Sequence, residues 1–131
     1  MKSKLLAEAK KIQAKAYAPY SNFKVGAAIL TADGNIYAGA NVENAAYPQA
    51  QCAEASAIGA MVAGGERKIT EILVYGDGEA ECTPCGGCRQ RIREFADGDI
   101  SIHVAGGGVV RNTYSLEELL PHSFGPDHLK K

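Results

Sequence analysis

The sequence predicts an α/β fold in which helices pack against one β-sheet. Three observations lead to this prediction. Segments with helical periodicity alternate along the chain with the apolar or alternating segments typical of strands. The 131 residues have the length of one ordinary domain, and no linker or internal repeat divides them. With 46% hydrophobic residues, the chain can form its own core, so we expect a single domain over residues 1–131.

The first half of the chain predicts a helix, a β-hairpin and a second helix. Apolar residues recur at helical spacing from Leu5 to Ala16, on one face of an N-terminal helix. The apolar segments 25–30 and 36–40 flank an Asp-Gly turn, which is the pattern of a β-hairpin. Residues 52–63 favour a helix that is almost entirely apolar, and such a helix is expected to be buried on all sides.

The second half of the chain predicts further strands and helices. A helix is expected over 85–95, with Thr83 as its N-cap and Pro84 in its first turn. Ser115 opens a capping-box sequence, Ser-Leu-Glu-Glu, which predicts a short final helix. Three segments have the pattern of strands: 69–75, 100–104 and 109–114.

The cysteines point to a metal site. The N-terminal segment lacks the apolar stretch of a secretory signal, so we predict a cytoplasmic location, where clustered cysteines indicate metal binding or catalysis. Cys85 and Cys88 share one face at the start of a predicted helix, and Cys52 opens the other helix. The positive end of a helix favours the thiolate over the thiol. These three cysteines therefore predict a zinc site.

Two further residues decide the kind of site. If Cys82 binds, four protein ligands make the zinc structural; if it does not, a position stays open for catalysis. Cys82 precedes the predicted helix start, so we expect a partly buried loop residue and not a ligand. Glu54 follows Cys52 by two residues, and a carboxylate buried there would need a partner and would have a raised pKa suited to proton transfer. The local pattern equally allows Glu54 to face solvent.

The order of these residues resembles the zinc deaminases. C-A-E at 52–54 and P-C-G-G-C at 84–88 match the C-x-E and P-C-x-x-C pattern of that superfamily. Almost end to end, the chain is also similar to the small tetrameric cytidine deaminases, including A-P-Y-S at 18–21, N-V-E-N-A at 41–45 and S-F-G-P at 123–126. The resemblance implies a three-layer α/β/α sandwich with a five-stranded mixed sheet, usually assembled as a homotetramer.

The resemblance also implies an activity: zinc-dependent hydrolysis of cytidine and deoxycytidine to uridine and deoxyuridine, with release of ammonia, in pyrimidine salvage. One zinc ion per chain would be held by Cys52, Cys85 and Cys88. Glu54 would take a proton from water and deliver it to N3 of cytosine, hydroxide would attack C4, and Glu54 would then protonate the departing amine. Zinc lowers the pKa of water from ~15.7 toward ~7.

Part of the substrate pocket follows from the same resemblance. Phe23 would stack on the pyrimidine, although it is otherwise an ordinary apolar residue before a strand. Asn41 and Glu43 would hydrogen-bond to the ribose 3′-hydroxyl, although by pattern alone they are a turn residue and an exposed acid.

The remaining implied contacts use the backbone and neighbouring chains. The N–H of Ala53 would meet O2 of the base, and the carbonyl of Thr83 would hold the leaving amine. Tyr47 and Phe124 would reach into the site of a neighbouring subunit, although Phe124 could otherwise anchor the C-terminal segment.

Two positions depart from the family pattern. Many three-thiolate members read C-A-E-R, in which the Arg offsets thiolate charge, but this chain has Ala55. Three thiolates on one zinc ion leave a net negative charge, and our hypothesis is that Arg89, next to Cys88, offsets it. Lys24 stands where Pro is common in the family, beside the stacking Phe23.

Other functions stay open at this point. A related deaminase could act on another nucleoside or on blasticidin S, and a non-catalytic zinc module could use all four cysteines. The balance of 14 Lys+Arg and 15 Asp+Glu argues against a nucleic-acid partner, and no apolar segment is long enough to span a bilayer. The three histidines are expected to be structural or solvated: His103, His122 and His128.

Overall fold

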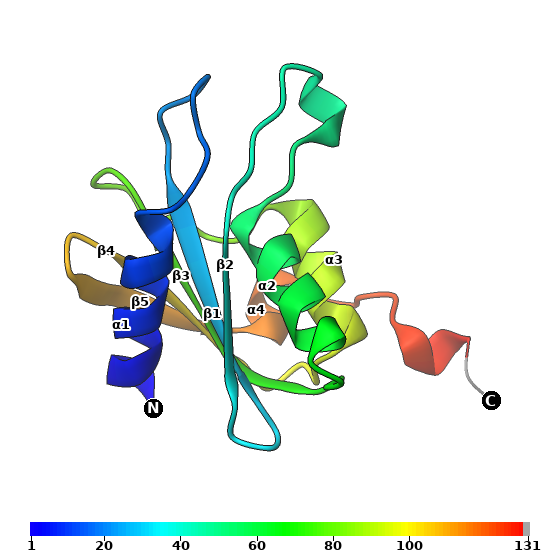
Figure 1. Cartoon of the computed structure of the whole chain (residues 1–131). Helices are drawn as coiled ribbons and strands as arrows, with labels where there is room; N and C mark the ends of the chain where they lie inside the picture. Colours follow the sequence, from blue (N-terminus) through cyan, green and yellow to red (C-terminus); the bar gives the residue numbers. More distant parts are fainter. Residues whose placement is uncertain (130–131) are drawn as a thin grey trace.

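A computed structural model describes residues 1–129 (Figure 1). Two short 3-10 helices, Tyr47–Gln49 and Pro126–His128, lie outside the main elements. The helices and strands are, in chain order, α1 (Lys2–Gln13), β1 (Val25–Thr31), β2 (Ile36–Ala40), α2 (Ala53–Ala63), β3 (Ile69–Gly76), α3 (Gly86–Glu94), β4 (Ser101–Gly106), β5 (Val109–Ser115) and α4 (Leu116–Leu119).

The five strands form one mixed sheet in the order β2-β1-β3-β4-β5. The hairpin partner β2 and the strand β3 both run antiparallel to β1, and β5 runs antiparallel to β4. The single parallel pair is β3 with β4. Parallel neighbours need a long crossover, and α3 lies in that connection. The predicted five-stranded mixed sheet is confirmed.

Helices cover both faces of the sheet, as Figure 1 shows. Leu5 and Ala9 of α1 pack in one buried cluster with Ala28 of β1, whereas the neighbouring Ala27 and Ile29 pack in the other cluster with α2 and α3. Successive side chains of a strand point to opposite faces, so both faces of β1 are buried. This explains its continuous apolar sequence and confirms the three-layer α/β/α sandwich.

Two helix predictions need correction. The first helix ends at Gln13, before Ala16, which is only half buried. The apolar helix α2 is not buried on all sides: Ala57 and Met61 face the core, but Gly59 and Ala63 are exposed. The sheet covers only one side of α2 in the single chain, so its apolar composition alone did not determine its burial.

His103 has the structural role expected for it. Its ring lies buried in β4, with Nδ1 2.8 Å from Oγ1 of Thr113 and Nε2 2.8 Å from Oε2 of Glu71. Both ring nitrogens are therefore used between neighbouring strands. The capping box predicted at Ser115 is also present, with Glu118 as its reciprocal partner.

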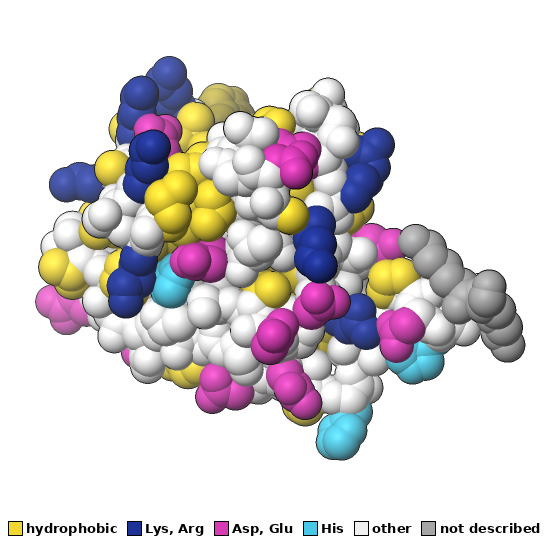
Figure 2. Space-filling model, turned by 90° about the horizontal axis from the view of Figure 1, so that it is seen from below, with side chains coloured by type: hydrophobic (Ala, Val, Ile, Leu, Met, Phe, Trp, Pro, Cys, Tyr) yellow, Lys and Arg dark blue, Asp and Glu magenta, His cyan; other side chains and the backbone are white. Residues whose placement is uncertain are grey.

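The end of the molecule opposite the long loops carries charges of both signs. On this face, Lys and Arg side chains are interspersed with Asp and Glu (Figure 2). Within residues 1–129, no helix combines the length and the apolar character that a membrane crossing requires.

The contact between α2 and β2 gives a test of the packing. A Cβ on Gly39 of β2 would lie 2.4 Å from the backbone N of Ala57, whereas a Cβ on the exposed Gly59 of α2 would meet nothing within 4 Å. We expect Gly39→Ala to lower the free energy of unfolding by about 1–3 kcal/mol, as overpacking does. Gly59→Ala should raise it by about 0.5–1 kcal/mol, because alanine favours a helix. Urea unfolding of both variants measures this, and equal effects would contradict the close contact.

Candidate metal centre and active site

Three cysteine sulfur atoms meet where two helices begin. Cys52 is the N-cap of α2, Cys85 is the N-cap of α3, and Cys88 lies in the first turn of α3. The three Sγ atoms lie within 4.8 Å of one another, and those of Cys52 and Cys85 are 4.0 Å apart. The predicted convergence of these cysteines is therefore confirmed.

The local sequence leaves these sulfurs free for another partner. Neither Cys52 nor Cys85 caps its helix through the side chain, although Ser, Thr, Asp and Asn are the usual N-cap residues and do so. Each helix start also carries a partial positive charge that stabilises an anion. Two such ends therefore face one group of sulfurs.

The start of α3 differs from the prediction. Thr83 is not the N-cap and Pro84 is not in the first turn, because the helix begins at Gly86. The Thr83 hydroxyl instead accepts a hydrogen bond from Arg89 at 3.3 Å, and the carbonyl of the buried Pro84 accepts another from Arg89 at 2.7 Å. The segment before α3 is thus held by a side chain of α3, which leaves Cys85 at the N-cap.

The donor set fits a zinc ion. Burial raises the pKa of the Cys52 and Cys88 thiols. Burial opposes ionisation of Cys85 too, but hydrogen bonds from the other two cysteines outweigh it and lower the pKa of Cys85. Three thiolates are soft ligands that suit zinc, and a cation between them offsets the cost of holding them in a partly buried place. Three protein ligands leave one position open, as in catalytic zinc sites.

Cys82 lies outside this group of sulfurs. Its side chain packs on β3, where a Cβ on Gly76 would lie 2.5 Å from the Cβ of Cys82. Burial raises the pKa of the Cys82 thiol to about 11, so it stays protonated near neutral pH. The expectation of a partly buried loop residue agrees with this environment.

Glu54 is buried beside the sulfurs. It is the second residue of α2, and only 5% of it is exposed. Burial raises the pKa of its carboxyl group, although the positive charge of Arg91 and a hydrogen bond with Cys88 oppose the rise. The solvent-facing alternative for Glu54 is therefore wrong. A carboxyl group with a raised pKa can exchange protons near neutrality.

Cys52, Cys85 and Glu54 line one cavity of about 180 Å³, whereas the buried Cys88 lies outside its lining. Its wall combines the two helix starts, the loop before α3 and the beginning of β1. The lining residues are Val25, Asn41, Cys52, Ala53, Glu54, Cys82, Thr83 and Cys85. Six of the residues that the sequence assigned to zinc, catalysis or substrate are thus brought together: Asn41, Cys52, Ala53, Glu54, Thr83 and Cys85.

Asn41 holds the edge of this cavity in place. Its Oδ1 accepts a hydrogen bond from the N–H of Val25 at 2.9 Å, and its Nδ2 donates to the carbonyl of Phe23 at 2.9 Å. Phe23 itself is exposed and lies near Gly76 and Gly78, outside the residues that line the cavity. Asn41 therefore fixes the backbone that carries Phe23, a role that the sequence did not reveal.

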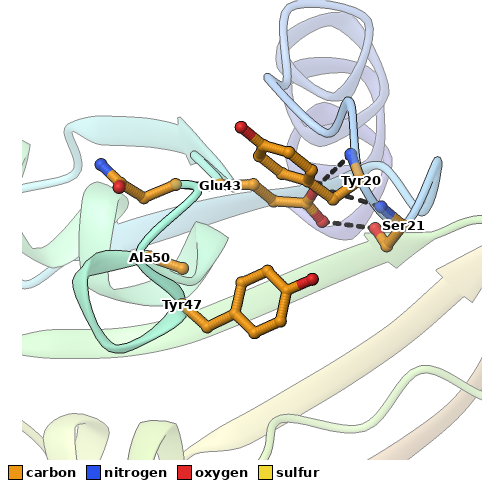
Figure 3. Close-up of a pocket in the computed structure, with 6 residues that line it drawn as sticks. Tyr20, Ser21, Glu43, Tyr47 and Ala50 are labelled. Atoms are coloured by element: carbon orange, nitrogen blue, oxygen red, sulfur yellow. Dashed lines mark hydrogen bonds between the residues drawn. The ribbon is translucent and has the colours of Figure 1, made fainter.

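Glu43 and Tyr47 lie in a second pocket of about 350 Å³ (Figure 3). One Glu43 carboxylate oxygen accepts hydrogen bonds from the N–H groups of Tyr20 and Ser21, at 2.9 and 3.1 Å, and the other accepts one from the Ser21 hydroxyl. The hydrogen bond from Ser21 lowers the pKa of Glu43. The rings of Tyr20 and Tyr47 meet edge to face, with centroids 6.3 Å apart. Glu43 therefore ties together the two long loops above the sheet.

Comparison with known proteins places this site in a family. Residues 1–104 match the family described as "Cytidine and deoxycytidylate deaminase zinc-binding region". The chain belongs to this family.

Individual relatives agree with the assignment. A cytidine deaminase of Sporosarcina psychrophila is 42% identical over 127 residues, which cover 96% of this chain and 93% of that protein. Among solved structures, a cytidine deaminase from Burkholderia pseudomallei superposes with a TM-score of 0.89 at 39% identity, covering 95% of this chain and 99% of the other. The cytidine deaminase from Mycobacterium tuberculosis gives a TM-score of 0.83 at 34% identity, covering 93% and 95%.

Phe124 lies in the C-terminal segment, beyond the residues 1–104 that match the family. Its ring stacks on His128 at 4.9 Å between centroids, and its carbonyl accepts a hydrogen bond from Gln90 at 2.8 Å. Arg93 holds the same segment through Ser123 and Asp127. Phe124 is 56% exposed and Tyr47 is 73% exposed, so neither is used in the core of its own chain.

The hypothesis that Arg89 offsets the thiolate charge is not supported. All the hydrogen bonds of its guanidinium group go to the Pro84 carbonyl, the Leu119 carbonyl and the Thr83 hydroxyl. Arg89 follows Cys88 in sequence, but successive helical residues point about 100° apart, so adjacency along the chain did not give contact. In this member of the deaminase family, Arg89 supports the loop before α3.

The separation of Cys82 from the other sulfurs can be tested by zinc content. We expect the purified protein to hold about one zinc ion per chain, Cys82→Ser to retain it, and Cys85→Ser to lose it, because three protein ligands suffice for a catalytic zinc site. Elemental analysis after gel filtration measures the ratio. Equal loss of zinc from both variants would instead favour a four-cysteine structural site.

Proposed function

We propose that this chain is a zinc-dependent cytidine deaminase, a hydrolase acting on the C–N bond of a cyclic amidine. It converts cytidine and deoxycytidine to uridine and deoxyuridine and releases ammonia, as pyrimidine salvage requires. The observation that carries the proposal is the buried carboxyl group of Glu54 in one cavity with the sulfurs of Cys52 and Cys85. The names of the curated relatives agree with this substrate class.

The roles of the residues follow from their chemistry. Zinc held by Cys52, Cys85 and Cys88 would supply a Lewis acid that makes water a nucleophile near neutral pH. Glu54 accepts a proton from water and delivers it to N3 of cytosine, which makes C4 more electrophilic. After the C4–O bond has formed, Glu54 takes the proton of the new C4 hydroxyl and gives it to the amine. The C4–N4 bond then breaks as the C4 carbonyl forms, ammonia leaves, and the first proton stays on N3.

Backbone groups at the cavity orient the base. The N–H of Ala53 belongs to the first turn of α2, where amides have no partner within the helix, so it is available to O2 of the pyrimidine. The Thr83 carbonyl lies on the loop before α3 and would accept a hydrogen bond from the amine. From the family resemblance we assign Phe23, which lies outside the lining of this cavity, to stacking on the base. Asn41 and Glu43, which line two separate pockets, are assigned to the ribose 3′-hydroxyl in addition to bracing the loops.

Ammonia release is the direct test of this function. Zinc-loaded protein is given cytidine, deoxycytidine, adenosine, cytosine and blasticidin S. We expect turnover of the first two and at least a 100-fold loss in Glu54→Gln, because general acid–base catalysis contributes about 10²–10⁴-fold. Glu117→Gln, a matched change of an exposed acid on α4, should keep its activity. Turnover of blasticidin S alone would keep the chemistry and change the substrate; full activity of Glu54→Gln would refute the assigned role.

The proposal includes a homotetramer with shared sites, formed by one catalytic domain of residues 1–131 per chain. The cavity of about 180 Å³ is smaller than the 300–1,000 Å³ usual for small-molecule sites, and we infer that a neighbouring chain extends it. Exposed aromatic side chains of Tyr47 and Phe124 are suited to complete the site of a neighbouring copy. The free cysteines suit the cytoplasm, which is the location that we propose.

Mixing two inactive variants tests the shared site. Glu54→Gln lacks the proton carrier, and Phe124→Ala lacks the group donated to the neighbour. If Phe124 acts across the interface, random hybrids of the two should regain about a quarter of wild-type activity, since that fraction of sites then pairs an intact Glu54 with an intact Phe124. Activity is measured after the mixed variants are dissociated and reassembled. No recovery in hybrids of confirmed mixed composition would mean that Phe124 serves its own chain or none.

A further inference from the structure

One arginine of α3 touches a sulfur of the metal group. The Nη1 atom of Arg91 lies 3.6 Å from Sγ of Cys88, within the range of a hydrogen bond to sulfur. Arg91 is exposed and Cys88 is fully buried, so this contact joins a surface guanidinium group to a buried sulfur. A charged donor makes a stronger hydrogen bond to an anion than a neutral donor does.

The other arginines of α3 are directed elsewhere. Arg89 donates to the carbonyls of Pro84 and Leu119. Arg93 pairs with Asp127 at 2.7 Å. Within residues 1–129, Arg91 is thus the one arginine of α3 that forms a hydrogen bond with a cysteine of the metal group.

The site has a surplus of negative charge that a cation would offset. Three thiolates around a divalent ion carry a net negative charge, and the carboxyl group of Glu54 is buried beside them. Residue 55, in the first turn of α2, is alanine and offers no charge. Arg91 contacts Cys88, and its positive charge also acts to lower the pKa of Glu54.

We propose that Arg91, through its contact with Sγ of Cys88, supplies the positive charge that balances the three-thiolate zinc site of this chain. The inference rests on the proposed function, since it needs zinc at the three cysteines. Arg91 is a positioning residue, because it acts through Cys88 and touches no reacting atom. The charge thereby comes from α3 and not from residue 55 of α2.

The sequence between the cysteines leaves room for this contact. A Cβ on Gly87 would lie 3.3 Å from Nη1 of Arg91, which is closer than ordinary van der Waals contact. A Cβ on the adjacent Gly86 would meet nothing within 4 Å. Any larger residue at position 87 would therefore press on the guanidinium group.

The test compares Arg91→Gln with Arg93→Gln, a matched loss of one charge from the same helix. Zinc affinity is measured by competition with a chromophoric chelator. Zinc with three thiolates has a net negative charge, and Arg91→Gln removes the positive charge beside it. We therefore expect Arg91→Gln to bind zinc about 10-fold more weakly, which is the lower end of the effect of residues that contact metal ligands. Arg93→Gln should bind zinc as the wild type does. Equal affinities for Arg91→Gln and the wild type would overturn the proposal.

A spectroscopic readout separates charge balance from a general effect on folding. In protein loaded with Co²⁺, the thiolate-to-metal charge-transfer band reports the electron density on sulfur. Loss of the donor to Cys88 should move this band to longer wavelength in Arg91→Gln, whereas Arg91→Lys, which keeps the charge, should move it less. A band that stays in place in Arg91→Gln would overturn the proposal.

A second-site change tests whether charge is the property that matters. Adding Ala55→Arg to Arg91→Gln places a cation near the same site from α2. We expect the double variant to recover at least half of the lost zinc affinity, measured on a logarithmic scale. No recovery in a double variant with a native circular dichroism spectrum would overturn the proposal. Wild-type protein that binds neither Zn²⁺ nor Co²⁺ would refute the zinc site itself, an outcome distinct from normal binding by Arg91→Gln.

Discussion

The convergence of two helix N-termini on one group of sulfur atoms is the constraint on which this structure depends. Both α2 and α3 lie on the same face of the sheet, and each begins with a cysteine at its N-cap. The crossover from β3 to the parallel β4 carries α3 to that face. The third sulfur, of Cys88, then follows from helical spacing, because a residue three positions after Cys85 lies on the same side of the helix.

This convergence concentrates negative charge in a small volume, and the fold offsets it locally. Partial positive charges at two helix starts stabilise the sulfurs, and the guanidinium group of Arg91 lies at the one sulfur that is fully buried. The role proposed for Glu54 has a different requirement, since a proton carrier must not be held permanently ionised. Its burial raises its pKa, while Arg91 limits the rise. Arg91 thus acts on both a metal-group sulfur and the carboxyl group of Glu54.

Sequence reasoning succeeded where one local rule acts alone. Hydrophobic periodicity located all five strands, and the spacing of the cysteines located the sulfur group. It failed where side chains compete for partners across the fold. Thr83 has the composition of an N-cap, but its hydroxyl binds the guanidinium of Arg89, and α3 begins later. Proximity in sequence suggested Arg89 as the partner of the thiolates, whereas the helix directs Arg91 to Cys88. The surroundings of α2 were also missed, because composition does not say how many sides the sheet covers.

Asn41 and Glu43 show why the resemblance and the structure add to each other. The resemblance assigns both to the sugar, while in this chain both bind backbone: Asn41 spans Phe23 and Val25, and Glu43 spans Tyr20 and Ser21. These contacts hold polar groups in fixed positions before any ligand arrives, so less side-chain entropy is lost on binding. The Asn41 amide nitrogen keeps a second N–H, and the carboxylate oxygen of Glu43 that accepts only from the Ser21 hydroxyl keeps one lone pair, so the bracing does not exhaust either group. The residues that hold the loops are therefore preorganised, so the substrate contacts proposed for them would need no rearrangement of the loops.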